Sequence, residues 1–182
     1  MREHATEESA VSTFAAYMVT CDERSAVRGE TLARFERTDW GSLPSLQIDD
    51  GTARTRSARM RATWLGVLRR VAEGSAGFAL VMEDDLDFNR HLRHNLTAWT
   101  PLRGRDGEAP FFGSIYNADR PALERPSDQS YFVADPDLAW GGQAVIVSRS
   151  MAHHFVAHWG EENRRFADRT VGLLSAILNG TQ

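Results

Sequence analysis

The sequence predicts an α/β fold, Rossmann-like in outline, with a mixed, mostly parallel sheet and helices on both faces. Apolar segments of strand length alternate with amphipathic helical segments through the first hundred residues. Residues 78–82, Phe-Ala-Leu-Val-Met, show no polar alternation, which is typical of a strand buried on both faces. Four acids follow within residues 83–87, at the strand end where open α/β sheets bind ligands.

The first half of the chain predicts two strands and two helices before the acidic segment. We expect strands at residues 14–19 and 45–48, and a helix at residues 26–35. A longer helix follows, because Met60, Trp64, Leu68 and Val71 recur at spacings of four and three. Thr55 or Ser57 caps its start, and Gly74 closes its end.

The second half continues this alternation. We expect a helix at residues 90–99, ended by Pro101, and a glycine-rich loop at 102–109. Strands are predicted at 111–116, at 131–133 within a long loop, and at 143–147. A helix at 148–159, capped by Ser148 or Ser150, and a last helix at 166–178 complete the prediction.

Composition indicates an ordinary globular chain. The 182 residues are 42% hydrophobic, which suits a flexible N-terminus at 1–10 and a single domain at 11–182. The net charge of -4 argues against a nucleic acid partner. Cys21 is the single cysteine, so no internal disulfide can form, and no apolar run is long enough to span a membrane. We therefore expect a cytoplasmic protein.

The acidic segment predicts a metal site, because crowded carboxylates repel one another and a divalent cation relieves that repulsion. Mg²⁺ and Mn²⁺ prefer oxygen ligands and often combine one or two carboxylates with substrate phosphates. Along a strand, Glu83, Asp85 and Asp87 share one face and Asp84 takes the other, although the alternation can fail past the strand end. The simpler alternative is a set of solvated acids.

Residues 78–88, Phe-Ala-Leu-Val-Met-Glu-Asp-Asp-Leu-Asp-Phe, resemble the "A-L-I-L-E-D-D" strand of glycosyltransferase family 25. That family includes lipopolysaccharide-type and collagen-type sugar transferases of the GT-A fold, and its motif is a variant of the DxD signature. Residues 141–152 resemble the family's "G-T-x-A-Y-L-I-S-x-x-G-A" segment, in the same order and at a similar separation. Residues 59–64 depart from the family's "G-C-x-x-S-H" stretch.

The resemblance implies a metal-dependent transferase that moves a sugar from a UDP- or GDP-sugar to a hydroxyl on a glycan, a protein or a small molecule. It places Mn²⁺ or Mg²⁺ and the diphosphate on Glu83 and Asp85, with Asp87 as a further candidate ligand and Asp84 on the ribose or sugar.

It also implies that the end of the first strand, at Thr20, Asp22 and Arg24, contacts the nucleoside, and that Asp168 is the general base if the enzyme is inverting. The simpler alternatives are a surface charge for Arg24 and an acid at a helix N-terminus for Asp168. Trp140 is our candidate for stacking on a sugar ring, because it adjoins Gly141 and Gly142.

Two alternatives remain open. A non-catalytic or degenerate nucleotide-sugar-binding domain would explain the departure at residues 59–64 and the short C-terminal part. A DxD-type phosphatase would use Asp85 and Asp87, but that pair lies mid-chain and Asn89 stands where such enzymes carry threonine. His154 and His158 have a metal-chelating spacing, yet a solvated or interfacial role is favoured over a zinc site.

Overall fold

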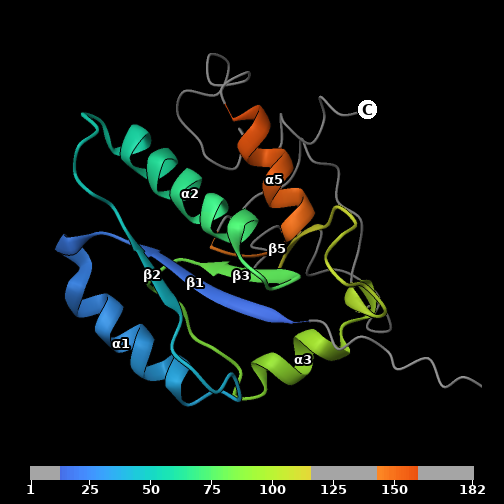
Figure 1. The fold of residues 1–182 in the computed structure, drawn as a ribbon. Coiled ribbons are helices and arrows are strands. Elements are labelled where there is room, and N and C mark those ends of the chain that lie inside the picture. The colour runs from blue at the N-terminus through green and yellow to red at the C-terminus, as the bar shows by residue number, and fades with distance from the viewer. Residues whose placement is uncertain (1–12, 116–142, 160–182) are drawn as a thin grey trace, which may run out of the picture.

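The computed structural model describes residues 13–115 and 143–159, and their five strands form one sheet in the order β2-β1-β3-β5-β4 (Figure 1). The predicted α/β architecture is confirmed at this level. The predictions for residues 1–10, 131–133 and 166–178 lie outside the described residues, and so does much of the predicted domain 11–182. The strands are β1 (Phe14–Thr20), β2 (Ser45–Ile48), β3 (Phe78–Met82), β4 (Phe112–Ser114) and β5 (Ala144–Ser148).

The sheet is mixed, as β5 is antiparallel to both of its neighbours while β1 runs parallel to β2 and β3. Apolar patterning does not reveal direction, because β5 is buried along its whole length like a central parallel strand. The carboxyl ends of β1, β2 and β3 therefore lie at one edge of the sheet, and β5 begins there. Met18 pairs in register with Met82, and Thr20 with Ile48.

One face of the sheet is covered by α2 (Arg56–Glu73) and α5 (Arg149–His158), which pack side by side (Figure 1). Trp64 of α2 and Phe155 of α5 are buried there, as the sequence predicts. They join the sheet residues Val19, Val81 and Val145 in one apolar cluster. Burying each such aliphatic side chain contributes roughly 1.5–3 kcal/mol to folding.

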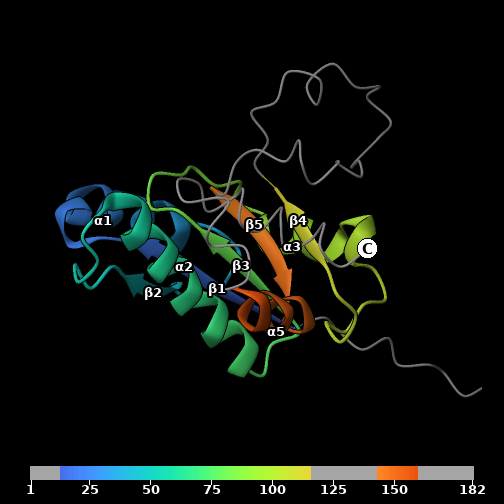
Figure 2. The same cartoon turned by 90° about the horizontal axis from the view of Figure 1, so that it is seen from above.

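The opposite face is covered by α1 (Ser25–Glu36) and α3 (Leu92–Ala98), so the fold has three layers (Figure 1). Figure 2 looks down on the same layers from above. Phe35, Leu92 and Leu96 pack in a second cluster with Met18 and Leu80 of the sheet. Met18 and Val19 thus serve opposite layers, as consecutive residues of a strand must. This double burial explains the unbroken apolar sequence of β3.

Helix boundaries follow from capping. The Thr55 hydroxyl accepts a hydrogen bond from the Ala58 amide at 3.2 Å, and the Ser148 hydroxyl accepts one from the Met151 amide at 3.1 Å, as predicted. The helix expected at 90–99 is shorter, because the Asp39 carboxylate accepts the amides of Arg93 and His94 and sets its first turn. Two 3-10 helices, η1 (Asp22–Arg24) and η2 (Thr100–Leu102), complete the elements.

Among the helices of the described ranges, none combines the length and apolarity that a bilayer crossing requires. β4 is shorter than the strand predicted at 111–116, and it is an outer strand of the sheet, next to β5.

Replacing Gly77 by alanine should destabilise the fold. A Cβ at this position would lie closer to the Asp106 carbonyl oxygen than real Cβ atoms come, and that oxygen is rigid backbone. Overpacking of this kind lowers the free energy of unfolding by about 1–3 kcal/mol, and urea unfolding of the variant measures this loss. Gly29 in α1 has open space at its Cβ, so Gly29→Ala is the matched control and should stabilise by about 0.5–1 kcal/mol. Equal stability of the two variants would contradict this packing.

Candidate functional site

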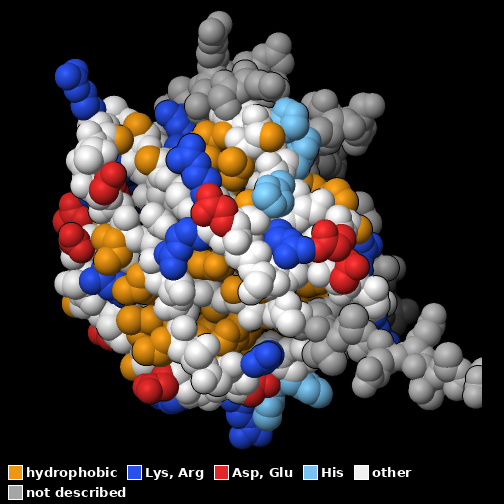
Figure 3. Space-filling view, viewed as in Figure 1, with side chains coloured by type: hydrophobic (Ala, Val, Ile, Leu, Met, Phe, Trp, Pro, Cys, Tyr) orange, Lys and Arg blue, Asp and Glu red, His pale blue; other side chains and the backbone are white. Residues whose placement is uncertain are grey.

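The acidic segment and the end of β1 meet at the carboxyl edge of the sheet. β3 ends at Met82 and delivers Glu83 and Asp84 to this edge, while β1 delivers Thr20 and η1 carries Arg24. The Glu83 amide donates to the Gln143 carbonyl at 2.8 Å, which fixes the backbone as the strand ends. Figure 3 shows acidic side chains gathered where β1 turns into α1, along the same edge. The ends of β1 and β3 thus lie together at this edge.

Asp84 is the buried centre of the cluster, with 3% of its surface exposed. One carboxylate oxygen accepts from the Thr20 hydroxyl, and the other accepts from Arg24 Nε at 2.7 Å. Its backbone carbonyl accepts from the Thr31 hydroxyl at 2.7 Å. Asp84 therefore ties β1, η1 and α1 to the end of β3, which favours a positioning role over the ribose or sugar contact that the resemblance implies.

Arg24 bridges two acids of the segment. Besides Asp84, its Nη2 donates to Asp85 Oδ2 at 2.9 Å, and the hydrogen bond to Asp84 raises the pKa of the guanidinium further. The side chains of Arg24 and Asp85 are 42% and 48% exposed, so this second contact faces solvent. Arg24 is therefore held at one end and accessible to a ligand at the other.

Glu83 carries the least compensated charge of the cluster. Its carboxylate makes no hydrogen bond or ion pair with any residue that the structure describes. Burial, followed by the charges of Asp85 and Asp84, raises the pKa of Glu83, while Arg24 and Arg56 act in the opposite direction. A cation placed beside Glu83 and Asp85 would relieve both the burial and the repulsion.

Asp87 lies apart from this pair. It is exposed and contacts Arg34 of α1 at 3.2 Å, so the predicted triad of Glu83, Asp85 and Asp87 is not brought together. Within the described residues, no group of three or more His, Cys, Asp or Glu side chains is arranged to hold a metal ion. Glu83 and Asp85 fit a cation only as a two-carboxylate site completed by ligand or water oxygens, an arrangement usual for Mg²⁺.

The remaining predicted residues divide into two groups. Asp22 lies in η1, exposed and next to the Arg24 network. Trp140 and Asp168 lie outside the described residues, so their predicted roles stay predictions. Cys21 is half-buried, and this burial is the main reason why the pKa of its thiol is raised.

A second ion-pair network, not predicted from the sequence, lies beside the first. Arg59 of α2 contacts Asp49 after β2 and Glu23 of η1, the latter at 3.1 Å. Asp49 also accepts the Gly51 amide at 2.9 Å, which shapes a turn after β2. The sequence did carry a signal for this network, because Asp49 directly follows β2 just as Glu83 directly follows β3.

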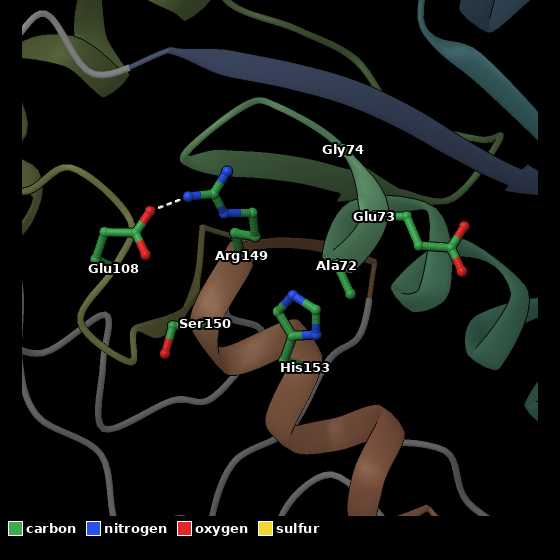
Figure 4. A pocket seen from close by; sticks show the side chains of 7 residues that line it. All are labelled: Ala72, Glu73, Gly74, Glu108, Arg149, Ser150 and His153. Atoms are coloured by element: carbon green, nitrogen blue, oxygen red, sulfur yellow. Dashed lines mark hydrogen bonds and ion pairs between the residues drawn. The ribbon is translucent and has the colours of Figure 1, made fainter.

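A pocket lies at the opposite end of the strands from the acidic segment 83–87. It has a volume of ≈ 490 Å³ and lies between the end of α2 and the start of α5 (Figure 4). Arg149 forms an ion pair with Glu108 there, and His153 projects beside them. The first amides of α5 are occupied, since Arg149 donates to Gly77 at 2.9 Å and Ser150 to Gly107 at 3.2 Å. The helix start thus offers few donors to an anion.

The two histidines of α5 with chelating spacing form a stacked pair. The ring centroids of His154 and His158 are 4.2 Å apart, and His158 Nδ1 donates to the His154 carbonyl at 2.9 Å. This hydrogen bond places the Nδ1 proton on His158.

Comparison with protein families, with curated proteins and with solved structures finds no match to this chain. The resemblance to glycosyltransferase family 25 therefore stands on the two sequence segments given above.

Removing the Asp84 carboxylate should cost far more stability than removing its neighbour's. Asp84→Ala loses charge-assisted hydrogen bonds from Thr20 and Arg24 and leaves a buried gap, and we expect a loss of about 2–3 kcal/mol in urea unfolding. Asp85→Ala removes an exposed ion pair, and its effect should stay below about 1 kcal/mol. Similar losses for the two variants would contradict the anchoring role of Asp84.

The metal-free protein should lose stability as the pH rises through the titration of Glu83. Because the pKa of Glu83 is raised in the folded state, folding favours its protonated form. Stability from this group is full below the unfolded pKa of about 4.3 and is lost as the pH rises through the higher folded pKa. Urea unfolding in EDTA across this range should show a decline that Glu83→Gln reduces. An unchanged pH profile in Glu83→Gln would contradict the assignment.

Proposed function

We propose that this chain is a metal-dependent glycosyltransferase that binds a UDP- or GDP-sugar at the carboxyl edge of its sheet. The observation that carries the proposal is the partly buried carboxylate of Glu83, which has no ion pair among the described residues and lies beside Asp85 and Arg24. This arrangement puts the carboxylate of Glu83 and the exposed carboxylate of Asp85, which Arg24 contacts, next to a guanidinium that is accessible to an anion. A divalent cation together with a diphosphate complements both signs of charge.

The described residues take distinct roles in this proposal. Glu83 and Asp85 would hold Mn²⁺ or Mg²⁺, and when bound the ion would neutralise charge on the departing nucleoside diphosphate. Arg24 donates to a diphosphate oxygen, and Asp84 with Thr20 keeps Arg24 in place. Asp22, in the same turn, is positioned for the nucleoside.

The acceptor side of the proposal rests on the sequence alone. A hydroxyl group on a glycan, a protein or a small molecule must lose its proton as it attacks the sugar, and Asp168 is the proposed base. Trp140 is the proposed platform for a sugar ring. The wider GT-A assignment rests on the sequence segments that resemble glycosyltransferase family 25.

The two alternatives predict different behaviour. A non-catalytic domain would bind the nucleotide sugar through the same residues without turnover, so metal-dependent hydrolysis of a UDP- or GDP-sugar separates it from an enzyme. A phosphatase needs a free aspartate nucleophile, whereas Asp85 is paired with Arg24 and Asp87 with Arg34. This pairing favours the nucleotide-sugar site.

Calorimetric titration with UDP and with GDP, each with and without Mn²⁺, tests the proposal. We expect one of the two nucleotides to bind only with the metal. The double variant Glu83→Gln with Asp85→Asn should weaken that binding at least about tenfold, equivalent to about 1.4 kcal/mol. Asp87→Asn is the matched control, because Asp87 contacts Arg34 instead, and it should bind within about twofold of the unaltered protein. Binding that ignores the metal and the double variant would contradict the site.

A further inference from the structure

We propose that Arg24 is an exchangeable counter-ion, which holds Asp85 in the empty site and transfers that hydrogen bond to the diphosphate when metal and nucleotide bind. Asp85 is thereby released to the metal. The inference rests on the proposed function and adds a coupling between its two ligands that the acidic segment alone does not imply. Arg24 is a positioning residue for the metal and a direct contact for the diphosphate.

The two contacts of Arg24 differ in how easily they exchange. The Nε contact reaches Asp84, whose side chain is 5% exposed and is held from the other side by Thr20. The Nη2 contact reaches Asp85, which is 48% exposed. Exposed ion pairs contribute little to stability, whereas a buried pair is costly to break. The guanidinium can therefore keep Asp84 and release Asp85.

Competition follows from this geometry. Asp85 Oδ2 accepts Arg24 Nη2 at 2.9 Å, so an arriving cation meets a carboxylate oxygen that is already engaged and a positive charge beside it. Without nucleotide, Arg24 thus disfavours the metal. A diphosphate reverses this effect of Arg24 on metal binding, because its oxygens bind both the metal and the planar guanidinium fork.

Neighbouring arginines do not share this arrangement. Arg28 donates to the Cys21 carbonyl at 3.0 Å, and Arg59 is held by Asp49 and Glu23. Arg56 acts on Glu83 only through its charge. Among the described residues, Arg24 alone joins the buried and the exposed acid of the segment, so the coupling is assigned to it.

Two ligands that favour each other do so reciprocally. UDP or GDP should tighten Mn²⁺ binding, and Mn²⁺ should tighten nucleotide binding by the same factor. Part of this factor comes from direct contact between metal and diphosphate, and the remainder from release of Arg24. Only the second part depends on residue 24, which makes it separable.

The test is titration of Mn²⁺ followed by its electron paramagnetic resonance signal, with and without the nucleotide that calorimetry identifies. Arg24→Lys keeps a cation for Asp84 but lacks the fork that spans both acids. Arg24→Gln combined with Asp84→Asn removes both charges of the buried pair, so no carboxylate is left unpaired in the interior. Arg69→Gln is the control for replacement of an arginine outside the site, because Arg69 is exposed on α2 and has no ion pair within the described residues. Thermal melting confirms that each variant is folded.

In both Arg24 variants, Mn²⁺ should bind about threefold or more tightly than in the unaltered protein when nucleotide is absent, and the tightening by nucleotide should shrink by about fivefold or more. Arg69→Gln should leave both values unchanged. Equal Mn²⁺ affinities in the unaltered protein and the Arg24 variants would overturn the inference and leave the proposed function standing. Mn²⁺ binding that is weakened equally in the Arg24 variants with and without nucleotide would show that Arg24 has a merely structural role, and would also overturn the inference. Absence of any Mn²⁺ and nucleotide binding in the unaltered protein would overturn the proposed function itself.

Discussion

The buried carboxylate of Asp84 is the constraint on which the arrangement of the carboxyl edge depends. An isolated carboxylate in this position would be costly, and the fold offsets that cost with the Thr20 hydroxyl and Arg24 Nε. Since these partners come from β1 and η1, one side chain fixes how the ends of two parallel strands lie relative to each other. The Asp84 carbonyl extends the connection to Thr31 of α1.

The anchored centre gives the flanking acids their different characters. Glu83 has no ion pair in the described part of the chain, and Asp85 contacts the exposed end of Arg24. A fixed Asp84 between two acids whose contacts can change suits a site that binds and releases charged ligands. The pocket beside Arg149 lies at the opposite edge and takes no part in this arrangement.

Local sequence signals predicted most of the elements, because the strands are buried on both faces and the caps at Thr55 and Ser148 are explicit. The resemblance to glycosyltransferase family 25 assigned Thr20, Arg24 and the acidic segment to one site, and the parallel pairing of β1 with β3 brings them to one edge of the sheet. The antiparallel direction of β5 was not predictable, since burial on both faces gives the same pattern for either direction. Nor was the pairing of Arg24 with Asp84, because ion-pair partners 60 residues apart leave no periodic signal.

The most direct measurement is the position of Mn²⁺ in crystals grown with the metal and UDP or GDP, located by anomalous scattering. The account predicts one peak within coordination distance of the Glu83 and Asp85 carboxylates and of the diphosphate oxygens, with Arg24 still on Asp84. A peak at His153 beside the opposite pocket, or a nucleotide bound away from the carboxyl edge, would contradict it.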